Sequence, residues 1–219
     1  MALSVVTGAN RGIGLALVKQ LKRRGDVIAA CRIASPELSA LGVEVAEGIE
    51  VTDAEGAAKL AAAVNERSID LLINNAGVLI ADELDRLDFD DITKQFEINA
   101  LGPLRVTAAL RGRLKQGSKI GLVTSRMGSI DDNTSGGYYG YRMSKAALNI
   151  AGKSLAVDLR SAGVAVAILH PGMVKTDMVG NHGQVEPDDA AKGLLARLDE
   201  LTLETSGGFW HANGQRLPW

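Results

Sequence analysis

The chain has 219 residues, of which 46% are hydrophobic, and its 24 basic and 26 acidic residues give a formal charge of −2. This length suits one domain with a full core. The balance of charge argues against nucleic acid or an anionic membrane surface as a partner, and the longest apolar runs are too short to span a bilayer.

The start of the chain leads directly into the apolar run of residues 2–6, without the basic region of a signal peptide. The single cysteine, Cys31, cannot form an internal disulfide, which is usual in a reducing compartment. We therefore expect a cytoplasmic protein in which Cys31 packs in the core. Because the three histidines are far apart and lack partners at ligand spacing, we expect no metal site.

Apolar runs of strand length alternate with helical patterns along the chain. Expected strands are Leu3–Thr7, Val27–Cys31, Val43–Val51, Leu71–Asn74, Ile120–Thr124, Val164–Leu169 and Phe209–Ala212. Expected helices are Gly12–Arg24, Ala54–Arg67, Phe89–Lys115, Tyr139–Ser161 and Pro187–Glu200, with about two further turns possible in Ala34–Leu41. A polar loop is expected at Gly128–Gly137 and a tight hairpin turn at Asn213–Gly214.

Most of these strands lack polar residues at alternate positions, as strands buried on both faces do. Their order predicts an α/β protein with a single-domain, doubly wound Rossmann fold. We expect a mostly parallel sheet of about seven strands with helices on both faces.

A glycine-rich turn follows the first strand, in the sequence Thr7-Gly8-Ala9-Asn10-Arg11-Gly12-Ile13-Gly14. Gly8 permits the sharp turn, Gly12 lets the backbone approach a pyrophosphate, and Gly14 lets the next helix pack closely on the sheet. The free N–H groups at the start of that helix suit an anion. This turn predicts a dinucleotide site.

The end of the second strand bears on which nicotinamide cofactor binds. An acid there would bind a free ribose 2′-hydroxyl, but the sequence reads Ala29-Ala30-Cys31-Arg32. Arg32, and Arg11 in the glycine turn, suit a 2′-phosphate. This favours NADP(H) over NAD(H), against the alternative that both arginines are solvated surface charges.

Tyr141 and Lys145 lie four residues apart, on one face of an expected helix. A tyrosine titrates near pH ~10, so acid–base work at neutral pH needs a pKa lower by roughly three units. A nearby ammonium, together with the positive end of a bound cofactor, could supply that change.

These motifs together resemble the short-chain dehydrogenase/reductase family over essentially the whole chain. The resemblance rests on the glycine turn, the Asn74-Asn75-Ala76-Gly77 stretch, Asn99, Ser125, the Tyr141–Lys145 pair and Pro171-Gly172. The stretches 125–129 and 133–141 are most similar to the small carbonyl reductases of the sniffer and C-factor-like group. The resemblance implies one domain, residues 1–219, with a cofactor half at roughly 1–115 and a catalytic and substrate half at roughly 116–219.

The family implies four catalytic residues. Tyr141 protonates the carbonyl oxygen, or removes a proton in oxidation, and Lys145 lowers its pKa while holding the nicotinamide ribose. Ser125 bonds the substrate oxygen. Asn99 holds a water that relays protons to Lys145, although it could equally be a hydrogen-bonded core residue. Ser129 is the rival to Ser125, because Ser125 precedes Tyr141 by 16 positions and 13 is more usual.

The resemblance also assigns the cofactor site, including Tyr141 and Lys145. Its other members are Gly8, Asn10, Arg11, Gly12, Ile13, Gly14, Arg32, Glu50, Val51, Asn75, Ala76, Gly77, Pro171, Gly172, Val174 and Thr176. Glu50 departs from the family, which usually carries Asp before the valine, so its contact with adenine could differ.

Substrate contacts are expected at Arg126, Met127, Met173 and Met178, while Trp210 could serve the substrate or the core. We expect an NADPH-dependent reductase of a small aldehyde or ketone. The alternatives are a C-factor-like NAD(P)-binding signalling protein with little turnover and an NAD-dependent alcohol dehydrogenase. A homodimer through the two long helices is possible.

Overall fold

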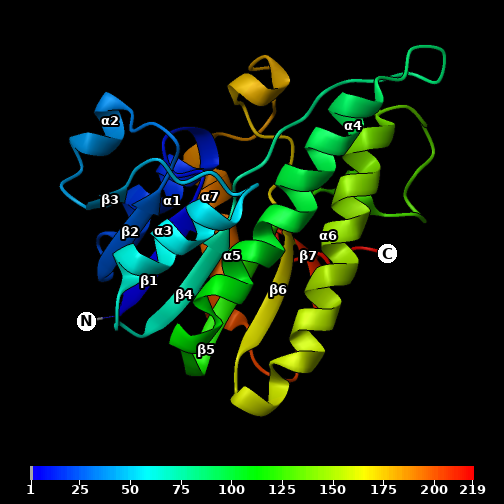
Figure 1. The fold of residues 1–219 in the computed structure, drawn as a ribbon. Helices are drawn as coiled ribbons and strands as arrows, with labels where there is room; N and C mark the ends of the chain where they lie inside the picture. The colour runs from blue at the N-terminus through cyan, green and yellow to red at the C-terminus, as the bar shows by residue number, and fades with distance from the viewer. Residues whose placement is uncertain (1) are drawn as a thin grey trace.

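The structure, a computed structural model, describes residues 2–219 and is built on one sheet. In these residues, seven strands lie in the order β3-β2-β1-β4-β5-β6-β7. They are β1 Leu3–Thr7, β2 Asp26–Ala30, β3 Glu44–Ala46, β4 Ile69–Asn74, β5 Leu114–Val123, β6 Ala165–His170 and β7 Gly208–His211. Every neighbouring pair is parallel, which confirms the doubly wound fold and makes the sheet wholly parallel (Figure 1).

The helices cover both faces of the sheet. They are α1 Gly12–Leu21, α2 Pro36–Ser39, α3 Ala54–Val64, α4 Phe89–Phe96, α5 Gly102–Leu110, α6 Tyr139–Asp158 and α7 Pro187–Glu200. Short turns of 3₁₀-helix follow at Arg111–Arg113, Arg126–Gly128, Arg160–Ala162 and Asp177–Val179. In residues 2–219 no helix is both long enough and apolar enough to cross a membrane.

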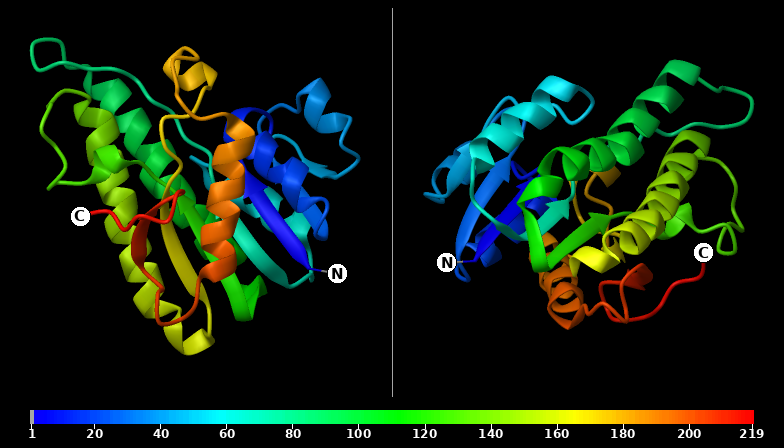
Figure 2. Two further views of the ribbon diagram at one scale, coloured as in Figure 1. Left: turned by 180° about the vertical axis from the view of Figure 1, so that it is seen from behind. Right: turned by 60° about the horizontal axis from the view of Figure 1, so that its bottom comes forward.

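Two hydrophobic cores lie on opposite faces of the sheet (Figure 2). One core joins the strands to α3, α5 and α6, with Leu60, Val106 and Leu148 almost fully buried. The other joins them to α1 and α7, with Leu17 and Leu194 as central side chains. Because both faces are covered, the strands carry apolar residues without alternation, as the sequence indicated.

The strand order reverses between β1 and β4, which are neighbours although they are far apart in the chain. The carboxyl ends of parallel strands meet at one edge of a sheet, and a crevice opens where the order reverses. Gly8 follows β1 and Ala76 follows β4 at this point. A Cβ added to Gly8 would lie 2.8 Å from Cα of Ala76, so the two turns touch.

The expected helix Phe89–Lys115 is wrong in its length and continuity. It divides into α4, a π-helical turn at Glu97–Leu101, and α5, which ends at Leu110. Pro103 has no N–H to donate to the carbonyl of Asn99, so the regular α-helical register cannot pass this point. Lys115, expected in the helix, lies in β5, which begins at Leu114.

The third strand is shorter than expected, while the C-terminal turn forms as expected. The third strand is Glu44–Ala46 rather than Val43–Val51, and the chain leaves it at Gly48, whose φ is +73°. Near the C-terminal end, the chain reverses at Asn213–Gly214 as expected, and Trp210 forms an antiparallel bridge with Arg216. His211 also donates its N–H to the carbonyl of Gln215 at 2.8 Å.

Candidate active site

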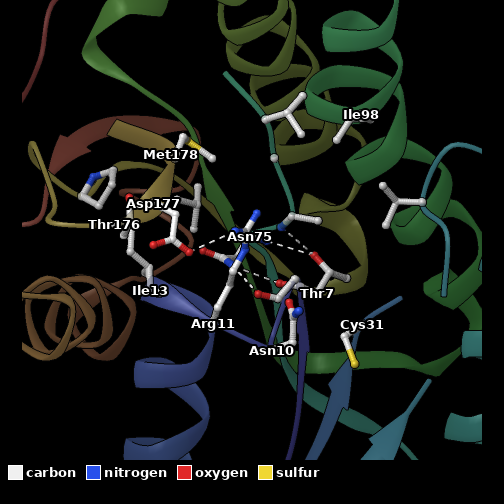
Figure 3. Close-up of a pocket in the computed structure, with 18 of the residues that line it drawn as sticks. Thr7, Asn10, Arg11, Ile13, Cys31, Asn75, Ile98, Thr176, Asp177 and Met178 are labelled. Carbon is white, nitrogen blue, oxygen red and sulfur yellow. Dashed lines mark hydrogen bonds and ion pairs between the residues drawn. The ribbon is translucent and has the colours of Figure 1, made fainter. Parts of the chain in front are cut away.

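The main cleft lies at the carboxyl ends of the strands, where the strand order reverses, and has a volume of about 680 Å³. Its lining comes from the ends of β1, β2, β4 and β5, from α6, and from the loop between β6 and α7. Figure 3 shows the cleft from the side of the glycine-rich turn. Its volume and its position match the ligand sites of open α/β sheets.

The glycine-rich turn is folded as the sequence predicts. Gly8 and Gly12 have φ of +63° and +52°, values that favour glycine. A Cβ on Gly14 would lie 2.1 Å from the carbonyl oxygen of Gly8, so only glycine lets α1 start this close to the strand. The N-terminus of α1 therefore opens into the cleft beside a side-chain-free backbone.

Asn75 ties this turn to β4. Its Nδ2 donates to the carbonyls of Thr7 at 3.1 Å and Gly8 at 3.2 Å, and its backbone N–H bonds the Thr7 hydroxyl at 3.0 Å. These contacts are visible in Figure 3. The hydroxyl of Thr7 also accepts the N–H of Ala76 at 3.1 Å. The Asn75-Ala76-Gly77 stretch thus forms the second wall of the cleft.

The two arginines that suit a phosphate both line the cleft. Arg11 pairs with Asp177 of the β6–α7 loop at 3.1 Å, as Figure 3 shows, and Arg32 lies 3.9 Å from Glu50. Both arginine side chains are about two-thirds exposed, at 65% and 68%. Exposed pairs of this kind contribute less than about 1 kcal/mol each, so either guanidinium is free to change partner.

Tyr141 and Lys145 lie on α6 at the far end of the cleft and are 7% and 5% exposed. Burial raises the pKa of Tyr141 to about 12, while the nearby Ser125 side chain opposes that rise. Burial lowers the pKa of Lys145 to about 8. The expected fall in the phenol pKa involves a bound cofactor as well as Lys145, so it stays a prediction. In the chain without cofactor, desolvation dominates the pKa of both groups.

Ser125 and Ser129 occupy different positions. Ser125 precedes a 3₁₀ turn, accepts the N–H of Met127 at 3.1 Å and lies close enough to the Tyr141 phenol to lower its pKa. The hydroxyl of Ser129 instead donates to the carbonyl of Trp219 at 3.0 Å. Of the two serines, the structure brings Ser125 to the tyrosine.

The Ser125 turn is packed directly on α6. A Cβ on Gly128 would lie 2.7 Å from the backbone carbon of Lys145, so the turn touches the helix at the lysine. Asn149, one turn further along α6, donates to the carbonyl of Gly128 at 3.2 Å and accepts the Thr124 hydroxyl at 2.8 Å. These bonds fix the distance between the serine and the helix that carries the tyrosine.

Asn99 lies in the π-helical turn and is fully buried. Its side chain accepts the N–H of Val78 and donates to the Val78 carbonyl, both at 2.8 Å, and it donates to Ser144 at 3.0 Å. Both amide donors are thus used within the protein. The side chain has the bonding of a core residue, while the backbone carbonyl of Asn99 lacks its α-helical donor at Pro103.

The remaining predicted residues divide into two groups. Asn10, Ile13, Val51, Gly77, Pro171, Thr176 and Met178 line the cleft. Val174 does not: it is 4% exposed and bridges Val185. Gly172, Arg126, Met127 and Met173 also lie outside the lining, and Arg126 pairs with Asp132.

Several lining residues were not predicted from the sequence. They include Ile49, Val78, Ile98, Lys175, Asp177 and Asn181. Most lie in loops without hydrophobic periodicity, so their only signal is proximity to the predicted motifs. Cys31, predicted as a core residue, is 3% exposed and also borders the cleft.

The cleft combines two chemistries. At one end, backbone N–H groups and two guanidinium groups suit the phosphates of a dinucleotide. At the other end, a buried phenol, a nearby serine hydroxyl and a buried ammonium suit proton transfer to or from an oxygen. Among residues 2–219, no cluster of three or more His, Cys, Asp or Glu side chains could hold a metal ion.

Residues 3–187 match the family described as short chain dehydrogenase. The 1-hydroxy-2-glutathionyl-2-methyl-3-butene dehydrogenase of Rhodococcus sp. (strain AD45) is 47% identical, and the alignment covers all of both chains. The C-signal protein of Myxococcus xanthus is 48% identical over 69% of this chain and 93% of its own. The NADPH-bound carbonyl reductase from chicken fatty liver has a TM-score of 0.91 at 31% identity, with full coverage of both chains.

Proposed function

The chain belongs to the short-chain dehydrogenase family of oxidoreductases, and from this premise we propose that it reduces an aldehyde or ketone to an alcohol with NADPH. The observation that carries the proposal is the buried pair of Tyr141 and Lys145, with Ser125 close enough to affect the phenol pKa, in a cleft that also holds two arginines. The similarity to a carbonyl reductase with bound NADPH supports it.

The residues present fit an NADP(H) molecule. The glycine turn leaves a cradle that side chains would narrow. A Cβ on Gly12 would lie 3.2 Å from Cγ2 of Thr176, and a Cβ on Gly14 would lie 2.1 Å from the carbonyl oxygen of Gly8. Arg11 and Arg32 would hold a 2′-phosphate, and no acid follows β2 directly. Asn75, Ala76, Gly77, Pro171 and Thr176 would line the rest of the cofactor, which supplies or accepts the hydride when bound.

Tyr141 is the proposed general acid. Its hydroxyl and that of Ser125 would both bond the carbonyl oxygen, so that negative charge developing there meets two donors. Lys145 would hold the nicotinamide ribose and favour the phenolate that remains after proton transfer. In the reverse direction the same tyrosine would act as the base.

Asn99 is the proposed anchor of a proton relay. Its carbonyl, without the α-helical donor that Pro103 cannot supply, offers an acceptor for a water beside Lys145. The proximity of this segment is clear at Gly77, where an added Cβ would lie 3.1 Å from Asn99 Oδ1 and 3.6 Å from Lys145 Nζ. Such a water would return a proton to the active site after each turnover.

The substrate would enter between the Ser125 turn and the β6–α7 loop. Met173 and Met178, on that loop, are 52% and 41% exposed, and Met127 follows Ser125 closely. Flexible thioether side chains accept apolar groups of varied shape. An apolar or aromatic aldehyde or ketone fits this surface, and Arg126 stands at its edge, half exposed and paired with Asp132.

The test is turnover of a panel of aldehydes, ketones and quinones with NADPH and with NADH, for the wild type and Tyr141→Phe. We expect NADPH oxidation by the wild type, and at least a hundredfold loss of kcat with near-normal NADPH affinity in the variant, on the order of what general acid catalysis contributes. Unchanged kcat in Tyr141→Phe would contradict the proposed role.

A second candidate is oxidation of an alcohol, favoured by the 47% identity with a dehydrogenase named for a glutathionyl alcohol. The same panel should therefore include that glutathione conjugate with NADP⁺ and NAD⁺. Reduction of NAD⁺ in preference to NADP⁺ would support this candidate and overturn the proposed roles of Arg11 and Arg32. Oxidation of the conjugate with NADP⁺ would agree with the proposed roles of Arg11 and Arg32 and would reverse the proposed direction of the reaction.

A third candidate follows from the similarity to the C-signal protein. In a signalling protein of that kind, NADP(H) would bind and no carbonyl or alcohol would be turned over. Cofactor binding measured by calorimetry, together with an inert substrate panel, would favour this candidate over the reductase.

The proposal includes a homodimer in the cytoplasm. On α6, Met143, Ile150 and Val157 repeat every seven residues and are 53–65% exposed, so they form one apolar stripe. Phe89 of α4, the helix that lies beside α6 in Figure 1, is also exposed. Light scattering on the wild type and Ile150→Glu would test the dimer, since a charge in a buried stripe would leave only monomers.

A further inference from the structure

The helix that carries Tyr141 begins without a capping side chain of its own. The residue before α6, Tyr138, has φ of +52° and makes no side-chain bond to the helix. The first N–H groups of a helix have no partner within the helix and need one elsewhere. By contrast, Ser35, Asp53 and Asp88 cap α2, α3 and α4 from the position immediately before each helix.

Asp82 supplies what α6 lacks, from 56 positions earlier in the chain. Its backbone carbonyl accepts the N–H of Tyr138 at 2.9 Å. Its carboxylate accepts the N–H of Tyr139 at 2.5 Å through Oδ1 and that of Gly140 at 2.9 Å through Oδ2. One residue therefore satisfies three successive N–H groups that end immediately before Tyr141, and its negative charge suits the helix N-terminus.

The segment that leads to Asp82 is held in place by two buried amides. Gln95 and Asn99 lie four positions apart, on one side of α4 and the following π turn, and both are fully buried. Asn99 bonds both backbone groups of Val78, and Gln95 accepts the N–H of Ile80 at 2.9 Å. Val78 and Ile80 are thus fixed, and Asp82 is the next alternate residue of the extended segment 78–82. Figure 1 shows this segment passing over the start of α4.

The same segment presses closely on the start of α6. A Cβ on Gly140 would lie 2.5 Å from Nε2 of Gln95 and 3.1 Å from Oδ2 of Asp82. Within the described part of the chain, this Gln95 nitrogen is buried and has no hydrogen-bond partner. A glycine one residue before Tyr141 therefore allows α4 and Asp82 to reach the helix backbone.

We propose that Asp82 is a positioning residue for Tyr141. Asp82 links the cofactor-facing segment after β4 to the first turn of α6. Gly77 and Val78 line the cleft, and Asp82, four residues on, holds the turn that places the phenol. This inference rests on the proposed reductase function. Because a small misplacement of a reacting group lowers the rate strongly, the effect is expected in kcat rather than in cofactor binding.

The test compares Asp82→Ala and Asp82→Asn with Asp88→Ala, which removes the cap of α4 through its bonds to Asp90 and Asp91. We expect Asp82→Ala to lower kcat roughly tenfold, since the loss of a cap destabilises the first turn of a helix by roughly that factor. NADPH affinity should stay within about twofold of the wild-type value. Asp82→Asn keeps one acceptor oxygen, so its kcat should lie between those of the wild type and Asp82→Ala. Asp88→Ala should lose a comparable amount of thermal stability and keep its kcat.

Amide hydrogen exchange provides a second measurement that does not need turnover. The amides of Tyr139 and Gly140, which the carboxylate binds, should exchange faster in Asp82→Ala and at the wild-type rate in Asp88→Ala. If the wild type reduces no carbonyl, the proposed function fails, while the exchange comparison still decides whether Asp82 holds the turn. Unchanged exchange and kcat in Asp82→Ala, or equal kcat losses in Asp82→Ala and Asp88→Ala, would overturn the inference.

Discussion

Lys145 Nζ lies 5.7 Å from the centre of the Tyr141 ring and donates its hydrogen bond to the carbonyl of Val123, at 3.0 Å. The ammonium is thus above the phenol rather than at its hydroxyl. Burial opposes charge on both groups, so before a cofactor binds the phenol stays protonated, while Lys145, with a pKa of about 8, keeps its charge at neutral pH. The proposed acid–base role therefore requires the positive charge of the oxidised nicotinamide as a third member.

The ionisation of Tyr141 should depend on the cofactor. Because the chain has three tyrosines, the double variant Tyr138→Phe/Tyr139→Phe leaves Tyr141 as the only one. Without cofactor, ultraviolet absorbance should show no tyrosinate below about pH 10. Saturating NADP⁺ should lower the pKa by roughly two units, because a cation then lies beside the phenol. The same transition with and without NADP⁺ would contradict the three-member arrangement.

Replacing Lys145 should stabilise the protein while it abolishes activity. Burial lowers the pKa of Lys145 to about 8, so below pH 8 the folded state carries a buried charge that the unfolded state solvates. The unfolded state binds the proton up to about pH 10.5, and stability should rise with pH between these values. Lys145→Met should raise the free energy of unfolding at pH 7 by about 2 kcal/mol, measured with urea. If the stability gain of Lys145→Met over the wild type did not shrink between pH 8 and 10.5, the prediction would be contradicted.

Cofactor preference should depend on Arg32. Arg32→Ala should weaken NADPH binding roughly tenfold, the scale of one charge-assisted hydrogen bond, and leave NADH binding unchanged. Arg24→Ala is the matched control, because that arginine pairs with Asp199 and does not line the cleft. Fluorescence titration of both cofactors measures the effect. Equal losses for NADPH and NADH would show that Arg32 does not contact the 2′-phosphate.

The two serines provide a matched pair of variants. Ser125→Ala should lower kcat roughly a hundredfold, since it removes a donor to the oxygen that gains charge. Ser129→Ala should lower thermal stability through its lost bond to Trp219 and keep most of kcat. Steady-state kinetics with any substrate found in the panel decides between them. The opposite ranking would assign the catalytic hydroxyl to Ser129.

The partly buried His170 should make the protein sensitive to acid. Burial, then the charges of His211, Arg126 and Lys145, lower its pKa to about 3. The folded state keeps it neutral while the unfolded state takes up a proton below about pH 6.5, so stability is full above that value and falls as pH decreases toward 3. Between pH 7 and 5 the wild type should lose about 2 kcal/mol more than His170→Phe. Equal losses in the wild type and His170→Phe would contradict this prediction.

Much of the fold followed from patterns that act locally. The glycine turn at residues 8–14, the strands β1 and β6 and the helix α7 are set by residues close in sequence. The interrupted helix after Phe89 was not foreseen, since the apolar pattern continues through Asn99 and the break depends on the missing N–H of Pro103.

The candidate site was predictable in part. Tyr141 and Lys145, named from spacing and resemblance, line the cleft, whereas Arg126 and Met173, expected to contact the substrate, lie outside its lining. The raised pKa of Tyr141 in the chain without cofactor comes from burial, which depends on the packed fold. The cap by Asp82 joins residues more than fifty positions apart, and no local pattern announces such a contact. Long-range bonds of this kind become visible only when the fold is known.

The exposed pair between Arg11 and Asp177 has a kinetic consequence. It joins the glycine turn to the β6–α7 loop across the mouth of the cleft, so if Arg11 binds the 2′-phosphate, the pair breaks when cofactor arrives and forms again when it leaves. Added salt screens charges of this kind. The rates of cofactor arrival and departure should therefore respond to ionic strength, while hydride transfer inside the closed cleft should not.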